Sequence, residues 1–175
     1  MKQFHKILLT GILAVCLGII SAPPIFAWDW NKTEAAKSTE EDMDLAFTFQ
    51  KTTIHMDDEA ETIFKTLKKS EECFEQESCS YQGVDRTYTY DGFELGTYTM
   101  TGQSEKIKRV AILDNSVATP EGLTIGSGFE DMVSAYGSGY EKEDGCYCYT
   151  AGNTQLKIET ERGNVSAIVY ELTAE

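Results

Sequence analysis

The chain has 175 residues, of which 15 are basic and 29 acidic, giving a formal charge of −14 and an isoelectric point near 4.5. A charge this negative argues against binding DNA, RNA or an anionic lipid surface, because contacts to phosphate need clustered lysine and arginine. With 41% apolar and 11% aromatic residues, the composition is that of a folded chain.

The first 27 residues have the composition of an export signal. Lys2 and Lys6 make the start basic, residues 7–20 are almost wholly apolar, and small residues end the segment. This order is typical of a signal peptide that is removed after export, and we expect cleavage after Ala22 or Ala27. Without these residues the chain keeps 13 basic and 29 acidic residues, a charge of −16.

Two other interpretations of this segment remain open. Residues 13–16, Leu-Ala-Val-Cys, resemble a bacterial lipobox, which would make Cys16 the lipidated first residue, although Val15 is bulky where a small residue is expected. An uncleaved anchor is the other interpretation, because residues 7–27 approach the roughly 20 residues that span a bilayer. All three place the folded part outside the cytoplasm, secreted or at the cell surface, with membrane contact only through this segment.

Residues 28–45 are predicted to be a flexible tether. They are rich in Lys, Thr, Glu, Ala and Asp, and show no apolar periodicity beyond Trp28 and Trp30. Residues 46–175 are predicted to form a single domain, whose length of about 130 residues allows burial of roughly two-thirds of the unfolded surface.

The first half of this domain is predicted to begin with a strand and a helix. Residues 53–56 alternate between polar and apolar, as a half-buried strand does. Asp58 and Glu61 have the spacing of a helix N-cap and its N3 acid. The apolar residues that follow at helical spacing are Ile63, Phe64 and Leu67. Three strands are predicted after the helix, around 88–90, 93–95 and 107–112, because turn residues separate these alternating segments.

The second half shows the same order of patterns. Residues 123–125 alternate ahead of Ser127 and Glu130, which match the first helix start at a shift of 69 residues, and Gly137 suits the end of that helix. The strands predicted next are 147–149, 156–158 and 165–170. The last of them matches 107–112 at a shift of 58, so the first half has an insertion of about 11 residues, around Cys73 and Cys79.

Each half therefore has the pattern of a strand, a helix and three strands. We predict an α+β fold in which two such repeats, 46–113 and 117–173, join edge to edge in one antiparallel sheet of about eight strands. Both helices are expected on one face, since one helix on four short strands makes a poor core by itself. The other face would be open to solvent or to a partner.

Parts of the domain resemble a known group of sequences. The segments CSYQGVDRTYTY (79–90), FELGTY (93–98), DNSVATPEGLTIG (114–126) and the residues EDMV and YG within 130–137 are similar to uncharacterised exported proteins and lipoproteins of clostridia-like Gram-positive bacteria. The strand-helix-strands unit also resembles the repeat of the beta-lactamase-inhibitor-protein-like fold, shared by the small lipoprotein of the outer-membrane assembly machine. The resemblance covers 47–172 and implies a tandem domain whose relatives bind proteins and catalyse nothing; Cys146 and Cys148 fall outside its pattern.

Four cysteines lie beyond the export segment and the lipobox: Cys73, Cys79, Cys146 and Cys148. An even number in an exported chain favours disulfides, and four cysteines allow three pairings. Cys73 and Cys79 are close enough in sequence to close a small loop, whereas Cys146 and Cys148 would share one face of a strand near the upper limit for a direct bridge. The spacing is not that of a zinc site, and we expect neither a metal nor a cofactor.

Catalytic patterns are weak in this sequence. The acid-rich segments 40–44, 57–61 and 141–144 are better explained as solvated surface and helix-start residues than as an acid–base pair. No G-x-S-x-G motif occurs, and His55 has no evident nucleophile beside it. We therefore expect a non-catalytic module that binds another protein. The alternatives are a hydrolase of cell-envelope or dietary polymers that uses two carboxylates, and a purely structural envelope domain.

Tyrosines on the predicted strands are the candidate contact residues. They are Tyr88, Tyr90, Tyr98, Tyr147 and Tyr149, with Tyr170 on the last strand. Tyrosine is favoured in interfaces because its rigid ring combines apolar area with a hydroxyl. Aromatic residues are equally ordinary core residues of strands, so the sequence leaves both assignments open.

Overall fold

The computed structural model describes residues 43–173, so the predicted export segment, Cys16 and tether residues 28–42 lie outside the described residues. In chain order the described elements are β1 (Phe47–Phe49), β2 (Thr52–Ile54), α1 (Ala60–Thr66), β3 (Glu72–Glu77), β4 (Gly83–Tyr90), β5 (Phe93–Met100), β6 (Lys106–Ile112), α2 (Phe129–Tyr136), β7 (Glu141–Glu143), β8 (Cys146–Ala151), β9 (Thr154–Glu161) and β10 (Asn164–Leu172). Leu45, assigned above to the tether, is buried and belongs to the core. Within 43–173, neither helix has the length and apolar content to cross a bilayer.

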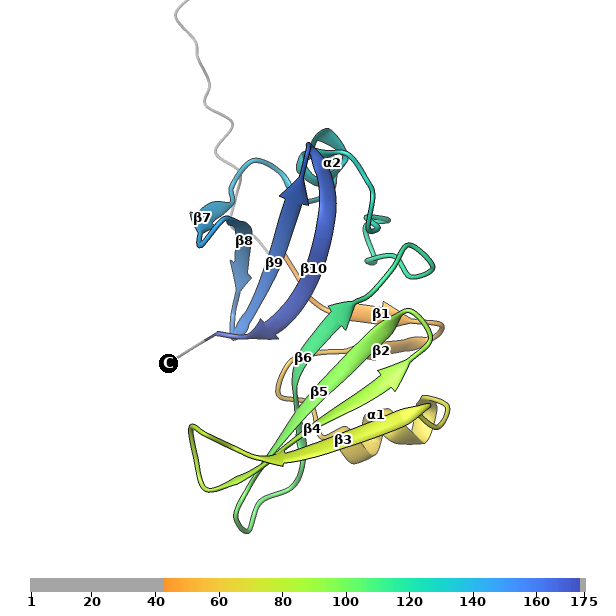
Figure 1. Ribbon diagram of the computed structural model, residues 1–175, viewed down its shortest axis with the longest axis vertical. Coiled ribbons are helices and arrows are strands. Elements are labelled where there is room, and N and C mark those ends of the chain that lie inside the picture. The colour runs from red at the N-terminus through yellow and green to blue at the C-terminus, as the bar shows by residue number, and fades with distance from the viewer. Residues whose placement is uncertain (1–42, 174–175) are drawn as a thin grey trace, which may run out of the picture. The chain divides into compact units, whose positions relative to one another are not determined.

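Eight of the strands form one antiparallel sheet in the order β3-β4-β5-β6-β10-β9-β8-β7 (Figure 1). The predicted α+β class and the antiparallel sheet of about eight strands are thus confirmed. The two halves meet edge to edge where β6 pairs with β10, with Val110 opposite Tyr170. Strands β1 and β2 pair with each other in a separate two-stranded sheet.

The strand that we predicted at the start of each half is not part of the large sheet. Residues 52–54 pair only with β1, and residues 123–125 are not a strand. The eight strands include instead β3 and β7, which the sequence did not predict. Every residue of these two edge strands is exposed, so neither strand carries the apolar alternation on which the prediction depends.

The first helix starts one residue later than predicted. Glu59, not Asp58, is the N-cap of α1, and no side chain caps this end. The Oδ2 atom of Asp58 accepts a hydrogen bond from the His55 N–H at 2.9 Å. Asp58 therefore closes the turn between β2 and α1 and does not cap the helix.

The second helix shows the same displacement. Gly128 is the N-cap of α2, and its N–H donates to Oδ2 of Asp131 at 2.8 Å. The predicted cap, Ser127, accepts a hydrogen bond from the Thr124 N–H at 3.1 Å and stabilises the preceding turn. Gly137 ends the helix as predicted, with a φ of +83° that suits glycine.

One row of cross-strand neighbours identifies the buried face of the sheet. The row runs through Tyr88, Leu95, Val110, Tyr170, Leu156 and Tyr149, each directly opposite the next. At one end Phe64 of α1 packs on Tyr88, with ring centroids 4.6 Å apart, and at the other end Tyr136 of α2 packs on Tyr149 at 5.3 Å. We call this side the helix face and the opposite side the open face.

Candidate functional site

The structure divides the five candidate tyrosines between the two faces. Tyr90 and Tyr149 are only 8% and 3% exposed and belong to the core. Tyr88 and Tyr147 are half-buried on the same helix face, packed against that core. Tyr98 lies on the open face, because residues of opposite parity along a strand point to opposite faces. The candidate tyrosines therefore do not form one surface patch, and Tyr90 and Tyr149 present no ring to a partner.

Tyr98 is held on the open face by a residue from outside the sheet. Asp57, in the turn after β2, accepts a hydrogen bond from the Tyr98 hydroxyl at 2.6 Å and another from Nζ of Lys106 at 2.9 Å. The turn is positioned by backbone hydrogen bonds to the start of β6: the Asp57 N–H donates to the Ile107 carbonyl at 2.8 Å, and the Ile107 N–H donates to the Asp58 carbonyl at 2.9 Å. The β1–β2 hairpin thus supplies one acid to the sheet surface.

A second group of the same composition adjoins the first. The Tyr81 hydroxyl donates to Asp85, and Nζ of Lys108 lies 2.7 Å from Oδ1 of Asp85. The rings of Tyr81 and Tyr98 meet edge to face, with centroids 6.0 Å apart. We call the combined set the open-face cluster; its members are Asp57, Tyr81, Asp85, Tyr98, Lys106 and Lys108. Its two acids balance its two lysines, so the cluster is neutral on a strongly acidic protein.

The electrostatics of the cluster fix its protonation at neutral pH. The hydrogen bond from Tyr98, together with Lys106, lowers the pKa of Asp57. Burial would raise the pKa of Asp85, but the bonds from Lys108 and Tyr81 outweigh it, and the pKa is lowered. Burial and the bond to Asp57 raise the pKa of Tyr98 to about 12. The acids therefore stay charged and the tyrosines stay hydrogen-bond donors, which suits recognition better than proton transfer.

This pKa shift predicts how stability changes in acid. Because the folded-state pKa of Asp57 is lowered, its contribution is complete above the unfolded-state value of about 3.9 and is lost as pH falls through the folded value. We therefore expect the free energy of unfolding to fall less steeply between about pH 5 and pH 2 in Asp57→Asn than in the wild type. The difference should be less than about 1 kcal/mol, because the Asp57 side chain is 39% exposed and its ion pair is screened by solvent. Urea unfolding across this range measures the effect, with Asp91→Asn in an exposed turn as the control. Parallel profiles for wild type and Asp57→Asn would contradict the prediction.

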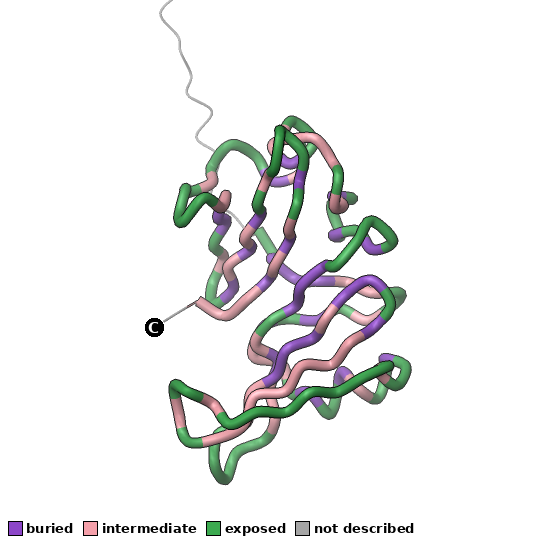
Figure 2. The backbone as a smooth tube through the Cα atoms, in the orientation of Figure 1, coloured by how far each residue is buried: buried purple, intermediate pink, exposed green. Residues whose placement is uncertain are grey.

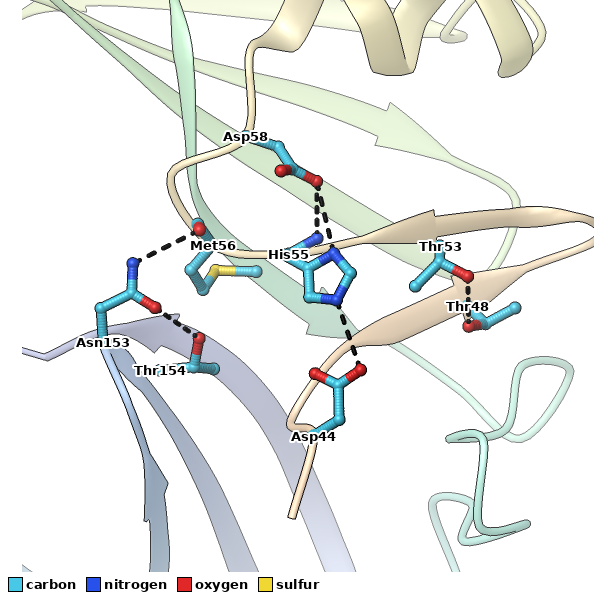
Figure 3. A network of polar contacts seen from close by, with 8 residues as sticks. All are labelled: Asp44, Thr48, Thr53, His55, Met56, Asp58, Asn153 and Thr154. Atoms are coloured by element: carbon cyan, nitrogen blue, oxygen red, sulfur yellow. Dashed lines mark hydrogen bonds and ion pairs between the residues drawn. The ribbon is translucent and has the colours of Figure 1, made fainter. Parts of the chain in front are cut away.

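A second polar group surrounds His55, next to the turn between β8 and β9 (Figure 3). Its Nε2 lies 3.4 Å from Oδ2 of Asp44, and its Nδ1 lies 3.7 Å from Oδ2 of Asp58. Asn153 reaches from the turn to the Met56 carbonyl, with its Nδ2 donating at 3.5 Å. The two carboxylates contact opposite edges of the imidazole ring, and among residues 43–173 no three acid, thiol or imidazole groups are placed to hold one metal ion. The group connects the start of the domain to its second half.

All four cysteines of the described chain are free thiols, so the disulfides that we expected are not formed in this structure. Strand β3 is extended and carries Cys73 away from Cys79, because a strand advances about 3.3 Å per residue. Cys146 and Cys148 lie on the open face of β8. The thiol of Cys146 donates to Oε1 of Glu159 at 3.7 Å, and Cys148 is only 3% exposed.

These environments predict an order of reaction with a maleimide. The exposed thiols of Cys73 and Cys79 should be modified first. Burial and Glu159 raise the pKa of Cys146, and burial and Glu143 raise that of Cys148, so both should react more slowly, with Cys148 protected until the chain unfolds. Peptide mapping by mass spectrometry before and after adding urea identifies each modified residue. Thiols that accept the label only after a reductant is added would show that disulfides form.

Sequence reasoning identified Tyr98 but missed the other members of the open-face cluster. Tyr98 and Lys106 flank the turn at 101–104 and pair directly in the β5–β6 hairpin, a relation that the sequence signals. Asp57, by contrast, lies 41 residues before Tyr98 and 49 before Lys106, and no sequence pattern indicates that contact.

No protein-family model, no curated protein and no solved structure matches this chain.

Proposed function

We propose that the chain is an extracytoplasmic, non-catalytic module that binds another protein through the open face of its sheet. The observation that carries this proposal is the open-face cluster, in which Tyr81 and Tyr98 form a half-buried aromatic pair surrounded by two ion pairs. Both helices pack on the opposite face. Aromatic residues held in place by neighbours lose little conformational freedom on binding, which favours affinity.

Two exposed apolar side chains extend this surface. Phe74 on β3 is 63% exposed and Met100 on β5 is 38% exposed. Their register, opposite Thr87 and Gly83 respectively, places both on the open face with Tyr98. A mixture of exposed apolar groups, aromatic rings and paired charges is the composition of a protein-binding surface rather than of a site for an anionic ligand.

We also propose that the sheet consists of two repeats, within 46–113 and 117–173. The element order supports this, because α1 is followed by β3 to β6 and α2 by β7 to β10. Two edge-to-edge repeats give an open face that continues across the whole sheet. The N-terminal export pattern supports a location outside the cytoplasm, secreted or at the cell surface.

Photo-crosslinking on intact cells tests the proposed binding surface. A photoreactive residue placed at position 74 should capture a specific protein, and Tyr98→Ala should reduce that capture by at least about 30-fold, the effect of losing an interface hot spot of 2 kcal/mol. Tyr98→Phe keeps the ring but loses the hydrogen bond to Asp57. Comparing its capture with that of Tyr98→Ala separates the contribution of the ring's contact area from that of the hydrogen bond that positions the ring. Met100→Ala should weaken capture, whereas Met43→Ala, at a residue 44% exposed beside His55, is the matched control. Equal capture by all variants would refute binding through the open face.

A further inference from the structure

Strand β3 is a free edge of the eight-stranded sheet. It pairs with β4 over all six of its residues, and within the described chain no strand pairs with its other side. All six residues are exposed, and Figure 2 shows the strand in the exposed colour along its length. The opposite edge of the sheet, β7, has only three residues. The sheet therefore has one long free edge and one short one.

The hydrogen-bond register determines which backbone groups of β3 face outward. Just beyond the strand, the Ser78 N–H donates to the Gly83 carbonyl at 3.0 Å. In an antiparallel pair alternate residues bond to the neighbouring strand, so Cys73, Glu75 and Glu77 direct their N–H and C=O groups away from β4. These groups form a template to which a further extended strand can add.

The side chains of β3 decide what kind of strand fits. Residues 71–77 contain four glutamates, and residues 70–85 contain no lysine, arginine or histidine. A second copy of β3 would bring two acidic strands together, which like-charge repulsion disfavours. Glu75 already bonds Arg86 at 2.7 Å, whereas Glu72 and Glu77 form no ion pair within 43–173. Charge complementarity therefore selects a basic segment.

We propose that the free edge of β3 binds an extended segment of a partner protein in which lysine or arginine alternates with apolar residues. The basic residues of this added strand lie beside Glu75 and Glu77 on the helix face. Its apolar residues lie beside Phe74 on the open face. This site shares Phe74 with the surface proposed above, but it includes no member of the open-face cluster and does not depend on binding there. The competing explanation is that the glutamates only prevent strand pairing, which predicts that no strand binds.

A designed peptide tests the proposal on the purified full chain. The probe is the blocked peptide Ac-TKVKVKVKT-amide, added antiparallel to β3. The control is the same peptide with the backbone nitrogen of each lysine methylated, which keeps the charge and removes the hydrogen-bond donors that face β3. By titration calorimetry the probe should bind at least about tenfold more tightly than the control, and more weakly as salt is raised. Amide exchange at Cys73, Glu75 and Glu77 should slow when the probe is bound.

Charge variants separate this edge from other acidic surfaces. Glu75→Gln with Glu77→Gln should weaken binding of the probe by at least about fivefold, because both carboxylates lie on the face that receives its lysines. Glu141→Gln with Glu143→Gln makes the same change of charge on the short β7 edge and should leave binding unchanged. The proposal is overturned by absence of binding, by equal loss in both double variants, or by protection of the Cys73, Glu75 and Glu77 amides already in the free chain. Tyr98→Ala should bind the probe normally, so failure of open-face binding would be seen separately.

Discussion

Tyr170→Ala is expected to lower the free energy of unfolding by about 3–5 kcal/mol, the usual cost of deleting a buried aromatic side chain. Tyr170 is fully buried at the centre of the sheet, opposite Val110 of the first half and Leu156 of the second. Its ring faces Phe47, with centroids 6.1 Å apart. The substitution would therefore open a cavity where the two halves and the β1–β2 hairpin meet. Urea denaturation at neutral pH measures the loss.

Tyr170→Phe is the matched control, because it keeps the ring and removes only the hydroxyl. That hydroxyl lies 3.2 Å from the hydroxyl of Tyr136, which also donates to Oε2 of Glu121 at 2.5 Å. Tyr136 therefore keeps a partner, and the expected cost is no more than about 1.5 kcal/mol. Equal losses in the two variants would show that the hydroxyl, not the packing of the ring, is the important feature.

Phe93→Ala is expected to cost a similar amount, about 3–5 kcal/mol. Phe93 is fully buried and stacks on Tyr90 with centroids 4.8 Å apart. It also contacts Phe47 at 5.1 Å and Phe49 at 4.8 Å, both from β1. These rings attach the small hairpin to the helix face of the sheet, and that attachment positions the turn containing Asp57.

A double-mutant cycle tests this attachment. Phe47→Ala and Phe93→Ala should be non-additive by about 0.5–1.5 kcal/mol, because the two rings share one contact. Phe93→Ala combined with Phe129→Ala should be additive to within about 0.5 kcal/mol, since Phe129 packs on Tyr147 in the second half. Additivity of the Phe47 and Phe93 losses would mean that the hairpin is held by other contacts.

The sheet strands with one buried face were predictable because burial produces alternation. Leu156 and Ile158 on β9, and Ile168 and Tyr170 on β10, are buried on the helix face with a period of two. A register shift between Val165 and Ala167 interrupts this period at the start of β10. The edge strands β3 and β7 have no buried face and left no such signal. The alternation at 123–125 was misleading, because Leu123 is buried by loop packing without joining a strand.

The candidate site was only partly predictable, for a related reason. Alternation indicates that Tyr88 and Tyr90 lie on one face of the sheet and Tyr98 on the opposite face. It does not indicate which of the two faces the helices cover. That depends on contacts such as that between Phe64 and Tyr88. The four cysteines are free thiols in this structure, and cysteine number alone does not reveal that β3 separates Cys73 from Cys79. The expected disulfides stay a prediction.

By itself, the sequence determined the α+β class, the turns between neighbouring strands and the end of the second helix at Gly137, because each depends on local periodicity or backbone conformation. Only the tertiary structure decided which tyrosines are core and which is on the surface. It also decided that Asp57 bonds Tyr98 and Lys106. Both depend on tertiary contacts, and those of Asp57 join segments more than 40 residues apart, for which one sequence contains no pattern.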